Sequence, residues 1–170
     1  MKLVQILRTG KPDEPLVVTL TGARLGDRVY FHGARAEWLV PLGARVGLSG
    51  QVVLIADRAT DLKDRAEREG VLVEVADAPE PGAGFDLAIV DATGNWAATL
   101  PALLAAVRRG GRIVVLAGGA PAGLLARFRK QAPDAPGDPE IVTALSAAGW
   151  GRARPIDSHQ GLRAVEAFHL

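Results

Sequence analysis

The sequence predicts an α/β fold: a Rossmann-like three-layer sandwich with a mostly parallel sheet and a C-terminal antiparallel hairpin. Short runs of branched apolar residues alternate with amphipathic stretches along the chain, and runs that are apolar on both faces are typical of buried parallel strands. Helical crossovers between such strands put helices on both faces of the sheet. The tail, RARPIDSHQGLRAVEAFHL, has two strand-like runs around a turn near Gln160 and Gly161, which predicts the hairpin.

The chain of 170 residues fits a single domain. The sequence does not determine the structure of its first part, residues 1–21. Within it, residues 3–7 and 16–20 are apolar runs. Both are interpreted as strand candidates, which would cover an edge of the sheet or mediate pairing between two chains.

Five apolar runs are expected to form the parallel strands. They are short and rich in branched side chains, and they lie at residues 29–31, 52–55, 71–75, 87–90 and 113–116. The connection between the third and fourth runs, ADAPEPGAGFD, has too many prolines and glycines for a helix.

Amphipathic stretches after the first two strands predict helices over residues 36–46 and 59–68. Pro41 must start or kink the first helix, because proline has no N–H to donate to the preceding turn. A third helix is expected over residues 101–109, where a proline suits the first turn and arginines followed by two glycines suit the end.

Two further helices are expected in the last third of the chain. Leu124, Leu125 and Phe128 indicate the fourth, and residues 141–148 the fifth. The segment between them, residues 132–139, is the only linker-like stretch of the sequence.

Composition excludes several classes of protein. The absence of cysteine excludes disulfides, thiolate catalysis and thiolate metal sites, and three scattered histidines give no zinc site. No metal is therefore expected. No apolar stretch approaches the roughly 18–20 residues of a membrane span, and the start, MKLVQILRTGKPDEP, lacks a secretory signal. A soluble cytoplasmic protein without a membrane partner is expected.

Charge gives little reason to expect nucleic-acid binding. The 20 basic and 19 acidic residues are well mixed, for a net charge of +1. Two small basic clusters are interpreted as solvated helix ends; they are Arg108 with Arg109 and Arg112, and Arg127 with Arg129 and Lys130.

The stretch from Asp27 to Asp57, DRVYFHGARAEWLVPLGARVGLSGQVVLIAD, has the layout of a nucleotide-binding strand, loop, helix and strand. Loops of this kind use glycine so that the backbone can turn sharply and approach a bound cofactor. Here the loop reads His-Gly-Ala-Arg-Ala-Glu from His32 to Glu37 and keeps one glycine, Gly33.

From about Leu25 to its end, the chain resembles the class I S-adenosylmethionine-dependent methyltransferases. The segments that carry the resemblance occur in the family's order and spacing: LGDRV, GARVG, SGQVVLIAD, VEVADAP, GFDLAIVD, VRRGGRIVVLAGG and SAAGW, followed by the hairpin. In that family the first strand ends in an acidic residue, and three alternating glycines follow. Those positions hold Phe31, Gly33, Arg35 and Glu37 in this chain.

The departures at Arg35 and Glu37 predict weakened cofactor binding. A non-glycine residue held in a left-handed conformation costs about 1–2 kcal/mol, and each 1.4 kcal/mol is worth about tenfold in affinity. Two such penalties would move a micromolar cofactor into the high micromolar or millimolar range.

The resemblance implies that S-adenosylmethionine binds along the ends of the first three strands. The candidate cofactor-binding residues are Gly33, Ala34, Asp57, Asp77 and Ala78. A carboxylate at Asp57 suits ribose hydroxyls, although an acid before a helix fits that position equally well. Asp77 and Ala78 match the adenine-contacting position, or form a turn before a proline.

Two residues are candidates for chemistry. Asp91, followed by Thr93, Gly94 and Asn95, ends the fourth strand, where ligands of open α/β sheets bind; a polar turn is the alternative. His32 suits a general base in the loop, or a hydrogen-bonded structural group. Methyl transfer needs mainly the positioning of the acceptor.

Three functions remain open. The first is a methyltransferase that uses S-adenosylmethionine to methylate a small molecule. The second is a non-catalytic methyltransferase-like domain that acts through self-association or a partner protein, with Trp38, Trp96 and Trp150 as interface anchors or as buried core. The third is a nicotinamide-dinucleotide-binding domain, because FDLAIVDATGN followed by VRRGGRIVVLAG also resembles medium-chain dehydrogenases.

Overall fold

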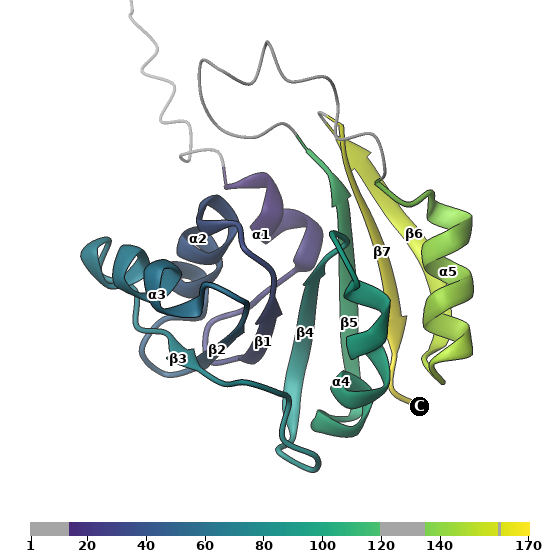
Figure 1. The fold of residues 1–170 in the computed structure, drawn as a ribbon, viewed down its shortest axis with the longest axis horizontal. Helices are drawn as coiled ribbons and strands as arrows, with labels where there is room; N and C mark the ends of the chain where they lie inside the picture. Colours follow the sequence, from purple (N-terminus) through teal and green to yellow (C-terminus); the bar gives the residue numbers. More distant parts are fainter. Residues whose placement is uncertain (1–13, 120–134, 160) are drawn as a thin grey trace, which may run out of the picture.

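The computed structural model describes residues 14–119, 135–159 and 161–170, and seven strands within them form one sheet. The strand order is β3-β2-β1-β4-β5-β7-β6, and helices cover both faces (Figure 1). Pairing is parallel from β3 to β5, whereas β7 is antiparallel to both β5 and β6. The predicted Rossmann-like α/β fold with a C-terminal antiparallel hairpin is confirmed.

The first half of the described chain builds the sheet from its centre to one edge. Its elements are α1 (Leu16–Thr21), β1 (Arg28–His32), α2 (Ala36–Val46), β2 (Gln51–Ile55), α3 (Ala59–Arg68) and β3 (Glu74–Val75). The helices predicted over residues 36–46 and 59–68 are confirmed as α2 and α3, with Pro41 inside α2.

The third predicted strand, residues 71–75, is wrong in its first part. Only Glu74 and Val75 pair with β2, although Val71 and Val73 are buried. Val71 packs so closely under α2 that a Cβ added to Gly43 would collide with its side chain. Val71 and Val73 therefore pack in the core beneath the helices and do not lengthen strand β3.

The second half builds the rest of the sheet and its other cover. Its elements are β4 (Phe85–Asp91), the short 3-10 helix η1 (Trp96–Thr99), α4 (Leu100–Ala106), β5 (Val107–Gly118), α5 (Asp138–Ala147), β6 (Gly151–His159) and β7 (Leu162–Phe168). Among the described helices, none is long and apolar enough to cross a membrane. Three expectations fall outside the described residues: the run at residues 3–7, the helix around Leu124 to Phe128, and the basic cluster beside it.

The helix predicted over residues 101–109 is wrong at its end, because α4 stops at Ala106 and the following arginines and glycines belong to β5. The N–H of Gly110 donates to the carbonyl of His169 (2.7 Å), and the N–H of His169 donates to the carbonyl of Gly111 (2.9 Å). Pairing with the end of the chain thus extends β5 backwards. The cluster of Arg108, Arg109 and Arg112 lies in a strand and not at a helix end.

The strand considered for residues 16–20 is also wrong, because this run forms α1. Helical spacing buries Val17, Val18 and Leu20 in one cluster with residues of α2, and Gly22 ends the helix in a left-handed conformation with φ of 58°. Packing against a neighbouring helix overrides the preference of the β-branched residues for strands.

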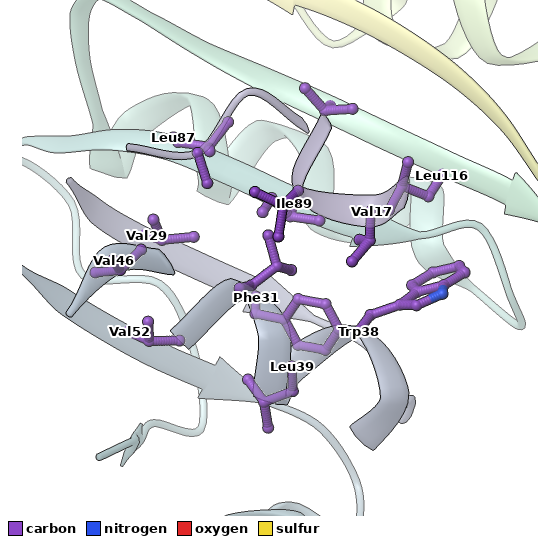
Figure 2. Close-up of a cluster of buried hydrophobic side chains, with 14 of the residues drawn as sticks. Val17, Val29, Phe31, Trp38, Leu39, Val46, Val52, Leu87, Ile89 and Leu116 are labelled. Carbon is purple, nitrogen blue, oxygen red and sulfur yellow. The ribbon is translucent and has the colours of Figure 1, made fainter. Parts of the chain in front are cut away.

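Two hydrophobic cores lie on opposite faces of the sheet, since successive residues of a strand point to opposite sides. One core joins α1, α2 and α3 to residues such as Val29 and Phe31; the other joins α4 and α5 to residues such as Tyr30 and Ile113. Figure 2 shows the Phe31 side chain within the first core, together with Trp38 and Leu39.

All three tryptophans are buried. Trp38 belongs to the first core, and Trp96 and Trp150 belong to the second. The Trp150 indole N–H also donates to the carbonyl of Leu100 (3.1 Å). The interpretation of these side chains as core is correct, and the interpretation as exposed interface anchors is wrong.

The outer strand of the hairpin, β6, has an irregular course. Its pairing with β7 shifts register between Gly151 and Arg154, and again between Pro155 and Asp157. Arg152 has a φ of 55°, in the left-handed region that non-glycine residues rarely adopt. The strand is also largely exposed to solvent, with α5 packed beside it (Figure 1).

Candidate functional site

The carboxyl ends of β1 and β4 meet at the centre of the sheet, where His32 lies opposite Val90 in the parallel register. The chain leaving β1 enters α2 on one face, whereas the chain leaving β4 passes through η1 into α4 on the other. Open α/β sheets bind ligands at the point where two such loops diverge, in the crevice between them. The candidate site is built at this point.

Gly33, the first residue after β1, brings the two strand ends into contact. A Cβ added to it would lie 2.7 Å from the Cβ of Asp91, closer than two carbon atoms can pack. Its N–H donates to the carbonyl of Ile55 at the end of β2 (3.2 Å). Glycine is therefore required here so that the loop can pass over Asp91.

Asp91 ends β4, and its side chain is only 3% exposed. The Oδ2 atom accepts a hydrogen bond from Nε of Arg35 (3.1 Å), while the buried Oδ1 has no hydrogen-bond partner among the described residues. Burial raises the pKa of Asp91; the charge and hydrogen bond of Arg35 oppose this rise, the negative charge of Glu37 adds to it, and the nearby side-chain hydroxyl of Thr93 opposes it. Of the two carboxylate oxygens of Asp91, Oδ2 is bound by Arg35 and Oδ1 has no close hydrogen bond among the described residues.

Arg35 lies between Asp91 and Trp38. Its guanidinium carbon is 4.2 Å from the centroid of the Trp38 ring, and a Cβ added to Gly119 would come within 3.4 Å of its Nη1 atom. The side chain is 20% exposed. Arg35 thus fills the space above Asp91 that a glycine would leave open.

The expected backbone penalty at the non-glycine positions is wrong. Arg35 has a φ of −101° in extended conformation, and Glu37 lies in the first turn of α2. Neither residue is left-handed, so the obstacle to a ligand at this loop is the Arg35 side chain itself and not backbone strain.

His32 ends β1 opposite Val90, whose side chain belongs to the second core, so alternation turns the imidazole to the face opposite Asp91. Its Nδ1 atom is buried without a hydrogen-bond partner among the described residues. Burial lowers the pKa of His32 below its ordinary value of 6.5, although the polar backbone of His32 itself and the charge of Asp57 act in the opposite direction. The imidazole is therefore neutral at pH 7.

The remaining predicted residues lie along the same edge but are not drawn into this contact. Ala34, Asp57, Asp77 and Ala78 are exposed, in the segments that follow β1, β2 and β3. Beyond Asp91, Thr93, Gly94 and Asn95 form an exposed turn in which the N–H of Thr93 donates to the carbonyl of Asp91 (2.8 Å). Phe31 is fully buried and replaces a carboxylate by an apolar contact.

Sequence reasoning missed the ion pair of Arg35 with Asp91 and the stacking of Arg35 on Trp38. Arg35 was noted only as a departure from glycine. A usable signal was present, because a long cation at a loop position of β1 can reach a carboxylate at the end of the adjacent strand, and an aromatic residue follows it at helical spacing three positions later.

Two open hollows among the described residues lie at the opposite, amino-terminal edge of the sheet. Their volumes are about 210 and 260 Å³. Arg24 and Arg112 line both, and Arg112 donates from Nη2 to the carbonyls of Thr21 and Gly22 (2.8 and 2.7 Å). These hollows are separate from the crevice between β1 and β4.

Comparison with known proteins identifies the fold. No protein-family model and no curated protein matches the chain. A SAM-dependent methyltransferase from Aquifex aeolicus has a TM-score of 0.68 and 19% identity, over 93% of this chain and 90% of its own. A SAM-dependent O-methyltransferase from Thermotoga maritima has a TM-score of 0.65 and 14% identity, over 93% of this chain and 64% of its own.

The structure of the cyclase SpnF is similar as well, with a TM-score of 0.58 and 17% identity over 85% of this chain and 60% of its own. The chain therefore spans less than two thirds of the Thermotoga methyltransferase and of the cyclase. At these identities the similarity establishes the class I methyltransferase fold. Because a cyclase shares this fold, the reaction must be argued from the site.

Proposed function

We propose that this protein, whose chain has the class I methyltransferase fold, binds S-adenosylmethionine in the crevice between β1 and β4 and methylates a small molecule. One observation carries the proposal: Asp91 Oδ1 and His32 Nδ1 are buried polar atoms without partners among the described residues. Such atoms are rare in folded proteins, because each one left unsatisfied costs about 1–3 kcal/mol. Their position at a topological switch point supports a polar ligand as the missing partner.

The residues along the edge fit this cofactor at several positions. Gly33 keeps the loop after β1 close over Asp91, because a Cβ there would lie 2.7 Å from the Cβ of Asp91. Asp57 and Asp77 follow β2 and β3 and are exposed, so their carboxylates are open to the ribose and adenine groups that the resemblance assigns to these positions. Arg35 is the residue of this set that obstructs the crevice.

The protein's part in the reaction is to place the acceptor and manage its proton. The cofactor supplies an activated methyl group when it is bound. His32 is neutral at pH 7, because burial lowers its pKa, so its ring can take a proton from an acceptor hydroxyl or amine. Asp91, on the face of the sheet that carries α2, would accept hydrogen bonds from the ligand.

Calorimetric titration of the full chain with S-adenosylmethionine, S-adenosylhomocysteine and NADPH tests the proposal. Saturable binding of the two adenosyl compounds, with Kd tighter than about 1 mM, is expected, together with a rise in Tm. Absence of binding at millimolar concentration would overturn the proposal. Binding of NADPH alone would favour the dinucleotide-binding alternative.

A non-catalytic methyltransferase-like domain is the second candidate, and one observation favours it. Arg35 already satisfies one oxygen of Asp91 and packs on Trp38, so the crevice is closed as it stands. A protein that used the fold only to associate with itself or with a partner would keep such a closure. It would fold normally, show no saturable binding in the titration, and sediment as an oligomer or bind a protein partner.

A further inference from the structure

We propose that Asp91 and Trp38 form a binding site for an organic cation, and that the Arg35 side chain occupies this site as an internal ligand. The cation for which the site is suited is a sulfonium or ammonium group, an assignment that rests on the proposed function. Arg35 must leave before such a group can enter, so it sets the affinity of the site.

Two kinds of contact with a cation define the site. On one side the Asp91 carboxylate lies 3.1 Å from Nε of Arg35; on the other the face of the Trp38 ring lies 4.2 Å from the guanidinium carbon. A carboxylate and an indole face both attract positive charge, and both do so more strongly when water is largely excluded. The groups that hold Arg35 are therefore those that would hold a cationic ligand.

Burying the carboxylate without a positive partner is costly. Its side chain is 3% exposed, and removing the partner of a buried charge is costly because the remaining charge is uncompensated. Burial already raises the pKa of Asp91 in spite of Arg35. A ligand that displaces Arg35 and carries a positive charge of its own is consequently favoured over a neutral molecule.

Arg35 can leave without disturbing the helix that follows it. It is the N-cap residue of α2, but its side chain makes no capping hydrogen bond to the first turn. Among the described residues, the exchange of one cation for another thus breaks the contacts with Asp91, with Trp38 and with the surroundings of Gly119. We therefore expect the Arg35 side chain to move out of the site while the backbone of α2 keeps its position.

Chemical rescue tests the cation site without any assumption about the cofactor. Arg35→Ser removes the side chain and supplies a preferred N-cap residue, which favours folding. Methylguanidinium chloride at low millimolar concentration should raise the Tm of this variant by about 2–4 °C relative to equal sodium chloride. The rise should vanish in Arg35→Ser/Asp91→Asn. A rise of the same size in that double variant, or no rise in the single variant, would overturn the proposal.

The matched control is Arg58→Ser. Arg58 is the N-cap residue of α3, also without a side-chain capping bond, and its side chain is 81% exposed. The two substitutions therefore share the change in charge and in helix cap but differ in the site. Methylguanidinium should leave the Tm of Arg58→Ser unchanged, and a shift equal to that of Arg35→Ser would count against a specific cation site.

Affinity measurements link the site to the proposed function. Arg35→Ser should bind S-adenosylmethionine about tenfold more tightly than the natural chain does, whereas the uncharged 5′-methylthioadenosine should gain less than about twofold. An equal gain for both compounds, or a loss for S-adenosylmethionine, would overturn the proposal while leaving the proposed function intact. If only the variant binds S-adenosylmethionine, the proposed function of the natural chain fails and the internal ligand stands.

Discussion

Asp91 and Arg35 are unequal partners in their ion pair. The Asp91 side chain is almost wholly buried, whereas a fifth of the Arg35 side chain meets solvent. If Asp91 is neutralised, the charge left behind can still be hydrated; if Arg35 is truncated, the charge left behind lies in a medium of low dielectric. Removing the charge of Arg35 should therefore lower the free energy of unfolding more than removing the charge of Asp91 does.

We expect Arg35→Met to lower the free energy of unfolding by about 2 kcal/mol at pH 7, and Asp91→Asn to change it by less than about 1 kcal/mol. The folded pKa of Asp91 is raised by burial, so the carboxyl costs no stability below its unfolded pKa and costs progressively more as the pH rises through the folded value. The loss in Arg35→Met should therefore shrink as the pH falls towards 4.

Urea denaturation of both variants between pH 4 and pH 8 measures these effects. The double variant Arg35→Met/Asp91→Asn is the control, because neither residue is charged in it, and it should recover most of the loss at pH 7. Equal losses in the two single variants, or a loss in Arg35→Met that grows on acidification, would contradict the expected asymmetry.

For single residues, the sequence predicted where along the sheet a residue lies better than it predicted which side chains touch. Because the strands are parallel, the residues that end them lie at one edge of the sheet, so the sequence alone assigns Gly33 and Asp91 to that edge. The rotamer of Arg35 could not be assigned in this way, because a flexible side chain chooses among several carboxylates within its reach. Arg35 pairs with Asp91 because that carboxylate is buried and most needs a positive partner, and the sequence does not reveal this burial.

For the secondary-structure elements, predictability depended on whether local pattern and tertiary packing agree. Helices α2 and α3 were predictable because amphipathic spacing and packing favour the same structure. In α1 and at the start of β5 they disagree: neighbouring α2 makes a helix of a strand-like run, and pairing with the C-terminal residues makes a strand of a helix-like end. Contacts between distant segments decided both cases.

Gly43 of α2 illustrates such a conflict in a single helix. Alanine is preferred to glycine in a helix by about 1 kcal/mol, yet a Cβ at this position would collide with Val71. We expect Gly43→Ala to lower the free energy of unfolding by about 1–2 kcal/mol, because overpacking outweighs helix propensity. Equilibrium denaturation monitored by circular dichroism measures the change.

Val71→Ala provides the control for this experiment. In that background the added methyl group has room, so Gly43→Ala should raise the stability of Val71→Ala instead of lowering it. The reversal of sign would identify the contact between α2 and Val71 as the cause. A stabilising effect of Gly43→Ala in the natural chain would contradict the close packing.

The whole molecule consists of two cores separated by one sheet. Both cores rest on the same strands, since β1, β4 and β5 send alternate side chains to each face. If the strands separate, both cores are exposed to solvent at once. We therefore expect the two cores to unfold together, as a single cooperative domain.

The tryptophans allow this cooperativity to be measured. Trp96→Phe/Trp150→Phe leaves Trp38 as a reporter of the first core, and Trp38→Phe leaves two reporters of the second. Within each variant, the fluorescence transition should coincide with the transition in far-ultraviolet circular dichroism. Separate midpoints in either variant would mean that one face melts before the other.

The irregular course of β6 bears on how these molecules meet one another in a crowded solution. An edge strand with regular, unpaired amides is a template onto which a second chain can add its own strand. In β6 the two register shifts and Pro155, which has no N–H, interrupt that template. Self-association through continuous sheet extension at this edge is thereby disfavoured, and the exposed strand is protected against aggregation.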